Sequence, residues 1–437
     1  MGYITATIIL VFGVINHVKS KKWSSPGAFF CYQWALICYL AALRLFGMYE
    51  ASIKTWIIII IGCISYLLGI YMANKVSFSV GKKHQVNNIV NEKESYLVFS
   101  KYYWFSAILA YIPEIRNFSK AIGLLRTGIS LDTIRHYYFG INDSSLYVRD
   151  SGIIVDLMSI FSAIGTIIIV IGIQLFISDP KHNKLKLVAS VGIVLFRAIS
   201  TGGRFDIVYF IIELLVCYSI YRHAGRKYEF KISNKVKRVI LVTLLGMVIA
   251  LIYVSVNRGV VFEEINEKYY RYICGNIVFL DLHITDIDAS GIWSLSYASL
   301  YGFWNIIFSL LHLLFHVNAP QLYTRTASQV LNAQTWKQIG NNMYTNAFIT
   351  PFYSPYADFR IIGVIVFMAF IGYFIQKIYR KTEELNSKNI VYYLLMMQII
   401  FKTLHMYPFT SKEYAWIMIL MIFNHIASRV KLLGRSA

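Results

Sequence analysis

Arginines gather in the polar stretches of an otherwise apolar chain, and their chemistry suits a phosphate-bearing ligand. We single out Arg126, Arg135, Arg197, Arg204, Arg258 and Arg271. A guanidinium group presents a planar fork of donors that binds phosphate oxygens in pairs, and it stays charged at every working pH. Several of them converging at one membrane surface would make a diphosphate site. For any single arginine, contact with solvent or lipid headgroups is the alternative.

The turn Ser200-Thr201-Gly202-Gly203-Arg204 is the sharpest of these cases. It joins two apolar runs, and its glycines let the backbone approach a ligand closely. Its amides begin the next helix, where an anion is favoured. Two alternatives stay open, because a glycine pair also makes a short helical hairpin and Arg204 could extend along the membrane surface.

The segment Asn341–Arg360 (NNMYTNAFITPFYSPYADFR) is rich in amide and aromatic side chains and too polar for lipid. Polar segments packed against membrane-embedded helices commonly form sites for polar substrates. We therefore expect Asn346, Tyr353 and Tyr356 to bind substrate here. Tyrosine at a membrane interface also serves as an anchor, which is the alternative for both rings.

Two patterns could bind a metal ion. Asp286 and Asp288 form an Asp-x-Asp pair, and His312 and His316 have the spacing of a ligand pair on one helical face. A third ligand is not evident for the histidines, and Asp-x-Asp pairs are common in loops. We predict no required metal and no cofactor.

The composition places these residues in a polytopic α-helical membrane protein. Of the 437 residues, 57% are hydrophobic and only 15% are charged. Spans in lipid must be helical, because the backbone finds no other hydrogen-bond partners there. The chain carries eleven apolar runs long enough to cross: Tyr3–Val18, Ala28–Gly47, Thr55–Ala73, Leu97–Pro113, Ile153–Ile177, Leu185–Thr201, Phe205–Tyr221, Val239–Val256, Ile361–Tyr379, Ile390–Tyr407 and Tyr414–Ala427.

The net charge of +20 follows membrane topology rather than a nucleic-acid ligand. Lysines and arginines cluster in alternate connections between the apolar runs, which is typical of cytoplasmic loops. This pattern places the N-terminus outside and the C-terminus in the cytoplasm. It also leaves two long external loops, at about 114–152 and 257–359, within a single membrane domain covering residues 1–437.

A twelfth apolar run, Tyr297–Val317, breaks this alternation if it crosses the membrane. We therefore interpret it as a re-entrant or interfacial helix within the second external loop. The fold class expected is an all-α polytopic membrane protein with 11 or 12 transmembrane helices.

Four stretches resemble the oligosaccharide repeat unit polymerases, the Wzy-type O-antigen and capsule polymerases of bacterial inner membranes. They are Leu124–Tyr138 (LLRTGISLDTIRHYY), Phe196–Asp206 (FRAISTGGRFD), Tyr270–Leu282 (YRYICGNIVFLDL) with the preceding Asn257-Arg258-Gly259, and Gly340–Gly363. Their order and spacing carry the likeness. One departure is visible, because Asp358-Phe359-Arg360 stands where the family pattern has Asp-Phe-Gly. Either that glycine is dispensable or Gly363 serves the turn.

The resemblance implies a glycosyltransferase that works at the outer face of the membrane. A polyprenyl-diphosphate-linked glycan would be transferred onto another lipid-linked repeat unit, with polyprenyl diphosphate as the leaving group. Arginines, with Arg204, Arg258 and Arg271 foremost, would neutralise the charge that gathers on that group. Tyrosines and amides would hold sugars. Asp281, His283 and Asp358 are candidates for the base that deprotonates the acceptor hydroxyl.

The expected partners are the lipid-linked oligosaccharide, membrane lipid and, by resemblance, a flippase and a chain-length regulator, with no nucleic acid. The expected location is the bacterial inner membrane. Two other functions compete. An O-antigen ligase would use the same donor with a different acceptor, and a lipid-linked oligosaccharide flippase would transport the glycan instead of transferring it.

Overall fold

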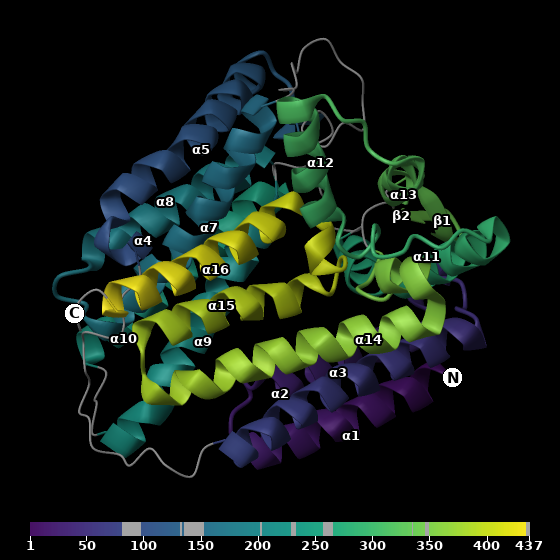
Figure 1. Cartoon of the computed structure of the whole chain (residues 1–437), viewed down its shortest axis with the longest axis horizontal. Coiled ribbons are helices and arrows are strands. Elements are labelled where there is room, and N and C mark those ends of the chain that lie inside the picture. Colours follow the sequence, from purple (N-terminus) through teal and green to yellow (C-terminus); the bar gives the residue numbers. More distant parts are fainter. Residues whose placement is uncertain are drawn as a thin grey trace. The chain divides into compact units, whose positions relative to one another are not determined.

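The computed structural model describes residues 1–80, 98–131, 133–134, 153–201, 203–228, 233–256, 265–333, 335–345 and 349–433 (Figure 1). Six helices of this described part are long and apolar enough to cross a membrane. They are α1 (Gly2–Ser20), α2 (Pro26–Leu43), α3 (Ile53–Val80), α7 (Ile153–Ser178), α10 (Asn234–Val256) and α14 (Tyr353–Arg380). The expectation of an all-α polytopic membrane protein is met at this level.

The five other runs expected to cross also lie on helices, which are shorter or carry more charge. These are α5 (Tyr103–Arg126), α8 (Lys184–Thr201), α9 (Phe205–Tyr228), α15 (Ser387–Lys402) and α16 (Lys412–Leu433). Eleven crossings and the sidedness of the termini therefore stay predictions. The remaining elements are α4 (Val98–Lys101), α11 (Ile265–Ser290), α12 (Tyr301–Phe315), α13 (Gln321–Asn332), β1 (Lys337–Gly340), β2 (Met343–Thr345) and 3₁₀ turns at Leu45–Gly47, Lys381–Glu384 and Pro408–Thr410.

The chain divides into two compact units that interleave along the sequence. The first comprises residues 1–87, 263–380 and 399–415, and the second comprises 88–262, 381–398 and 416–437. Both units are helical, and α15 and α16 each begin in one unit and continue into the other. One membrane domain over the whole chain stays a prediction.

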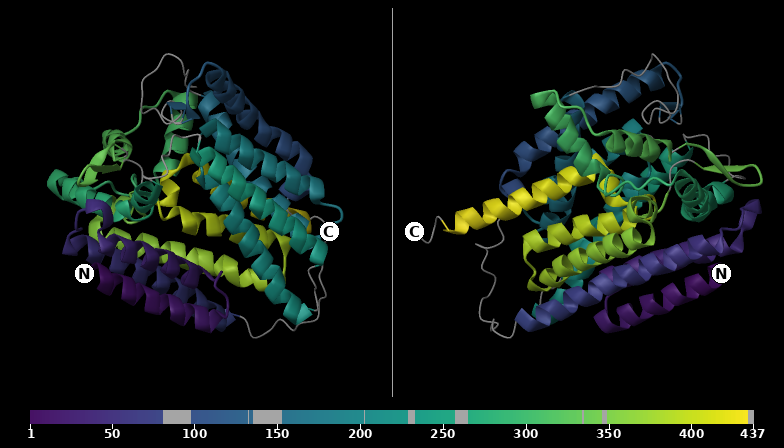
Figure 2. Two further views of the ribbon diagram at one scale, coloured as in Figure 1. Left: turned by 180° about the vertical axis from the view of Figure 1, so that it is seen from behind. Right: turned by 45° about the vertical axis from the view of Figure 1, so that its right-hand side comes forward.

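In the first unit, α3 and α14 pack side by side, with α1 and α2 beside them (Figure 2). The two helices approach closely because glycines lie at their contact. A β-carbon on Gly69 would stand 1.9 Å from the carbonyl oxygen of Ala369, and one on Gly372 would stand 2.0 Å from that of Tyr66. Small residues at such contacts allow two backbones to meet, which is a common basis of helix association in membranes.

The path of α14 breaks at Phe359 and Arg360, just before its long apolar part. Arg360 has φ 55° and ψ −138°, a backbone conformation that favours glycine. A β-carbon on Gly363 would lie 2.0 Å from the carbonyl oxygen of Pro355, so only glycine fits against this turn. Arg360 itself adopts the backbone conformation that glycine favours, so the turn forms without a glycine at position 360, and Gly363 lets the helix pack against the Pro355 carbonyl.

The predicted second external loop contains more regular structure than its sequence suggested. It holds the 26-residue helix α11, the helices α12 and α13, and an antiparallel pair of β1 and β2. Gly340 of β1 also bridges to Met48, which joins this pair to the chain just before α3. The 15 residues of α12 span about 22 Å, shorter than the membrane core of about 30 Å. Its length agrees with the interfacial or re-entrant interpretation.

In the second unit, α5, α7 and α8 pack against one another. The apolar run expected to cross ends at Pro113, within the longer helix α5. The helix continues to Arg126 with Pro113 inside it, so the first 13 residues of the expected external loop at 114–152 are helical. Proline is tolerated inside membrane helices because neighbouring groups can satisfy the carbonyl that loses its partner.

Candidate functional site

Residues of α11, the start of α3 and the start of α14 form a polar cluster in the first unit. Asp281 of α11 accepts hydrogen bonds from the hydroxyl groups of Ser52 and Thr55, the latter at 2.5 Å. Ser52 immediately precedes α3, whose first amides favour a negative charge. The Asp281 carboxylate is therefore fixed at a positive helix end while it remains partly exposed.

Asp288 lies two turns further along α11, where it binds two cations and a phenol. It pairs with Lys54 of α3, accepts a 2.9 Å hydrogen bond from the Tyr356 hydroxyl, and lies 3.8 Å from Nε of Arg360. Burial alone would raise the pKa of this carboxyl, but the hydrogen bonds from Lys54 and Tyr356 outweigh it and hold the pKa below its ordinary value. Asp288 is therefore ionised at neutral pH.

The guanidinium group of Arg360 lies among aromatic rings as well as beside Asp288. It is 5.6 Å from the ring centre of Trp293 and 5.7 Å from that of Tyr356, and it donates to the carbonyl oxygen of Ile287 at 3.2 Å. Cation–π contacts of this kind stabilise a positive charge near the surface. Arg360 thus carries a fixed positive charge at the end of the apolar part of α14.

His283 lies on the other face of α11, between aromatic rings. Phe279 and Tyr353 pack edge-to-face on it, with ring centres at 4.5 and 5.5 Å. Burial and the nearby charge of Lys337 lower the pKa of His283 to about 4, against the opposing charge of Asp286. The imidazole is therefore neutral at physiological pH, and only 5% of its side chain is exposed.

Asp358, the third candidate base, is completely buried and serves the backbone. Its carboxylate accepts hydrogen bonds from the amides of Ala298 at 3.0 Å and Ser299 at 2.8 Å. Buried carboxylates need such partners. Asp358 thus fixes the segment between α11 and α12, and Asp281 is the most accessible of the three candidate bases.

The two tyrosines expected to hold sugars are covered by protein. Tyr353 is 3% exposed and Tyr356 is 2% exposed. Tyr353 packs on His283, and Tyr356 has Lys54 at 5.6 Å from its ring centre in addition to Arg360. Neither ring face is open to a ligand in this structure, so their contacts position the cluster instead.

Exposed aromatic rings occur on and beside the neighbouring strand pair. Tyr344 of β2 is opposite Gln338 of β1, and the Gln338 amide donates to the Tyr49 hydroxyl at 3.0 Å. Tyr49 and Tyr344 are 42% and 46% exposed. A flat apolar face beside an amide suits a polar, ring-shaped ligand. This surface has a signal in the sequence. Successive side chains of a strand point to opposite faces, so residues two apart share a face.

Arg271 lies on α11 ten residues before Asp281, which corresponds to about 15 Å along the helix. It is partly exposed, and its guanidinium carbon lies 6.0 Å from the ring centre of Tyr272. Arg271 therefore belongs to the same helix as the cluster but does not contact Asp281.

In the second unit, Arg197 is buried among α5, α7 and α8 and is bound by protein groups. Its Nε donates to Glu114 at 2.7 Å, and its other nitrogens donate to the Thr166 hydroxyl at 2.8 Å and the Ser162 carbonyl at 2.6 Å. The arginine and glutamate side chains are 9% and 5% exposed. These hydrogen bonds give Arg197 a structural role. Its contact with a ligand stays a prediction.

Arg204 immediately precedes α9, and its Nη1 donates to the hydroxyl of Ser255 near the end of α10 at 3.2 Å. Arg126 is exposed at the last residue of α5. Arg135, Arg258 and Asn346 lie outside the described residues. Among the described candidate arginines of the second unit, Arg204 is partly exposed and Arg126 is exposed, whereas Arg197 is buried.

The two metal patterns have these outcomes. Asp286 pairs with Lys337 while Asp288 pairs with Lys54, so the two carboxylates face different elements. The rings of His312 and His316 are 6.3 Å apart and perpendicular. Among the residues that the structure describes, no group of three or more histidine, cysteine or acidic side chains could hold a metal ion.

The structure brings Asp281, His283, Asp358, Tyr353 and Tyr356 into one unit and places Arg197, Arg204 and Arg126 in the other. Sequence reasoning missed Lys54 and Arg360 as partners of Asp288. Lys54 is 234 residues away from it in the chain, a pairing that no local pattern signals.

Searches against protein-family models, curated proteins and solved structures find no match for this chain.

Proposed function

We propose that this chain is a glycosyltransferase that polymerises lipid-linked oligosaccharide repeat units for a bacterial surface polysaccharide. The observation that carries the proposal is the polar cluster at the ends of α3 and α14. There, partly exposed carboxylates and cations are fixed beside two long apolar helices. Acid, base and positive charge at the end of membrane helices suit a reaction between a polar glycan and a lipid carrier.

Asp281 is the base in this proposal. It would accept the proton of the acceptor hydroxyl, which attacks the anomeric carbon as the bond to the diphosphate oxygen breaks. Its hydrogen bonds from Ser52 and Thr55 orient the carboxylate without burying it. His283 and Asp358 are less suited to this role, because both are enclosed by protein.

The arginines have an electrostatic role in this reaction. Arg271, which lies in the same unit as Asp281, would stabilise the negative charge that develops on polyprenyl diphosphate as it leaves. Preorganised donors are most effective there because charge appears only as the bond breaks. The exposed Tyr49 and Tyr344 are added as sugar contacts, in place of the buried Tyr353 and Tyr356.

The test is the surface-glycan ladder of a strain whose chromosomal copy is deleted. We expect a single capped repeat unit after deletion and a restored ladder when the chain is supplied. Loss of even the single unit would contradict the proposal and favour a ligase or a flippase. The site variants are Asp281→Asn and Arg271→Ala, both expected to give only the single unit at normal protein abundance. Arg222→Ala, an exposed position in α9, is the control that should keep the ladder.

A further inference from the structure

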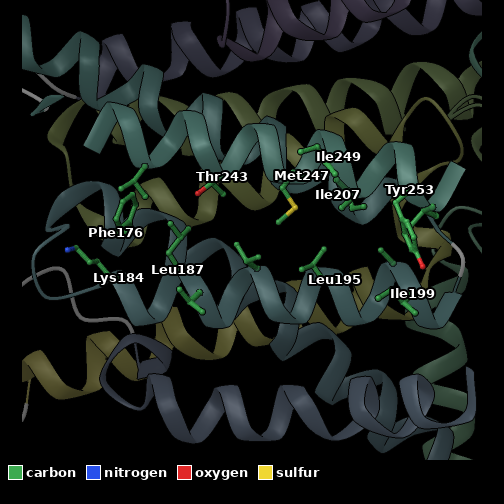
Figure 3. Close-up of a pocket in the computed structure, with 17 residues that line it drawn as sticks. Phe176, Lys184, Leu187, Leu195, Ile199, Ile207, Thr243, Met247, Ile249 and Tyr253 are labelled. Carbon is green, nitrogen blue, oxygen red and sulfur yellow. The ribbon is translucent and has the colours of Figure 1, made fainter. Parts of the chain in front are cut away.

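An apolar groove of about 700 Å³ lies between α8 and α10 in the second unit (Figure 3). Its lining includes Leu187 and Leu195 of α8 and Thr243 and Met247 of α10. Its volume lies within the range of small-molecule sites. Only five of the 23 residues of α10 are buried. A ligand in this groove would therefore supply much of the contact that α10 lacks with the rest of the unit.

Both helices place a lysine at the same end of the groove. Lys184 is the first residue of α8 and belongs to the lining. Lys235 is the second residue of α10 and stands four residues before Val239, a lining residue, so the two share one face of the helix. In Figure 3, Lys184 and Thr243 lie towards one end of the groove and Tyr253 lies at the other. The two helices therefore run in the same direction, and both begin at the lysine end.

The charge at this end is available to a ligand. Both lysine side chains are exposed, and neither has a hydrogen bond or an ion pair with the described residues. Asp179, in the connection before α8, is bound instead by His182 at 2.7 Å and by the amide of Lys181 at 3.2 Å. The first amides of α8 and α10 also lie here, where an anion is favoured.

The opposite end of the groove has a different character. Of the described residues that line the groove, Lys184 alone is charged. Arg204 lies near the other end but outside the lining, and it donates to the hydroxyl of Ser255. The groove is therefore apolar along its length and positive at the end where α8 and α10 begin.

The dimensions of the groove fit an ordinary phospholipid whose head lies at the lysine end. The lining on α8 extends from Lys184 to Ile199, about 22 Å at 1.5 Å per residue. One leaflet contributes about 15 Å, half of a hydrocarbon core of about 30 Å. An acyl chain that starts at Lys184 therefore ends near Leu195, and the rest of the groove lies in the other leaflet. The expected topology places the lysine end at the cytoplasmic face, where anionic lipids attract lysine.

We propose that the groove between α8 and α10 binds one anionic phospholipid, with its phosphate-bearing head at Lys184 and Lys235 and an acyl chain along the groove. A zwitterionic phospholipid has the same chains but brings its own positive group to the two lysines. The charge of the head therefore selects the anionic lipid. This site is independent of the proposed polymerase activity, because its evidence lies within the second unit alone.

The contact with the head is tested by removing charge. Lys184→Gln and Lys235→Gln should each weaken binding of an anionic phospholipid about five-fold, the usual contribution of one lysine near such lipids. Lys237→Gln is the matched control. Lys237 stands two residues after Lys235, on the other side of α10, and its Nζ donates to Asn234 at 3.4 Å. This control removes the same charge from the same helix end and should leave binding nearly unchanged.

The contact with the acyl chain is tested by filling the groove. Gly246 lies on the lining, and a β-carbon there would meet nothing within 4 Å. Side chains on a helix point back towards its N-terminus, so Gly246→Phe should occupy the groove at the level of Thr243 and leave α10 intact. Leu245→Phe is the matched control, because Leu245 is the neighbouring residue, is 54% exposed and does not line the groove.

The experiment uses the full chain in phosphatidylcholine nanodiscs that contain a photoreactive phosphatidylglycerol. A probe with its diazirine next to the glycerol should label peptides around Leu187 and Val239. A probe with its diazirine at the end of the acyl chain should label peptides around Leu195 and Met247. Labelling of the unmodified chain does not depend on how any variant folds. Labels in the reverse order, or on helices other than α8 and α10, would overturn the proposal.

Competition between lipids with identical acyl chains identifies the head. Unlabelled phosphatidylglycerol should compete about ten-fold better than phosphatidylcholine, and the Lys184→Gln/Lys235→Gln double variant should lose this preference. Gly246→Phe should lower labelling by both probes, and Leu245→Phe should not. Equal competition by the two lipids with the unmodified chain would mean a general lipid surface and would refute the proposal.

A second copy of the chain is the other occupant that the test can detect. All five natural cysteines are buried, so Gly246→Cys adds one thiol on the groove. We expect no disulfide between copies in nanodiscs, because lipid covers this position. A disulfide-linked dimer, together with a groove that takes no lipid label, would assign the groove to a second copy and would refute the phospholipid site.

Discussion

Arg360 combines a strained backbone with several side-chain contacts. Its φ of 55° and ψ of −138° fall where residues other than glycine cost about 1–3 kcal/mol. The surrounding contacts to Asp288, Ile287 and Trp293 hold it there. Strain of this kind persists only where the surrounding structure fixes the residue in place.

Replacing Arg360 separates strain from charge. Arg360→Gly and Arg360→Ala both remove the guanidinium group, but only glycine relieves the backbone. We expect the glycine variant to be more stable than the alanine variant by about 1 kcal/mol, measured as thermal unfolding in detergent. Both should lose polymer synthesis if the positive charge serves the reaction. Equal stability of the two variants would show that the turn is unstrained.

The buried imidazole of His283 makes stability depend on pH. Its pKa falls from 6.5 to about 4 in the folded chain, so between these values the unfolded chain binds a proton that the folded chain does not. The contribution of His283 to the free energy of unfolding is therefore fully present above about pH 6.5 and is lost as the pH falls toward 4. The loss amounts to at most about 3 kcal/mol, at 1.36 kcal/mol per pH unit.

The measurement is the thermal midpoint between pH 8 and pH 4 for the natural chain and for His283→Phe. Phenylalanine keeps the packing on Phe279 and Tyr353 and removes the titrating group. The variant should lose less stability on acidification than the natural chain. Parallel curves would assign the pH dependence to other groups.

At the scale of elements, the close contact of α3 and α14 depends on glycine. A methyl group at Gly69 would overlap the Ala369 carbonyl, so the helices would have to separate. We expect Gly69→Ala to destabilise the first unit by about 1–3 kcal/mol, the usual cost of overpacking. Gly123→Ala on α5 is the control, because a β-carbon there meets open space. It should be neutral or slightly stabilising, as alanine favours helix.

The same elements explain what could be predicted from the sequence. Continuous apolar runs predict helices well, and each expected span falls largely on one, although the runs ending at Gly47 and Tyr407 pass the ends of α2 at Leu43 and α15 at Lys402. The helix α5 continues to Arg126, beyond its apolar run, because hydropathy marks where an apolar run ends and not where a helix ends. Asp281 and His283 were found as candidates, yet their partners Ser52 and Tyr353 come from distant parts of the chain. Such pairings depend on packing, which no local pattern encodes.

At the scale of the whole molecule, the charge pattern predicts sidedness that labelling can test. All five cysteines are buried, so an added cysteine gives a clean signal. An impermeant maleimide should label Tyr344→Cys in intact spheroplasts, since that residue belongs to the expected external loop. Lys75→Cys lies near the C-terminal end of α3, on the side expected to be cytoplasmic. It should react only after permeabilisation. Labelling of both in intact spheroplasts would contradict the expected topology.

The buried Arg197–Glu114 pair also sets an order for biosynthesis. Glu114 leaves the ribosome 83 residues before its partner, so α5 reaches the membrane while the arginine is still unmade. A lone carboxylate is costly in lipid. The glutamate must therefore wait as a neutral acid or near water until α7 and α8 arrive. On this argument, a nascent chain arrested before Arg197 should hold α5 less firmly than one that includes Arg197, because the guanidinium group that pairs with Glu114 is still absent.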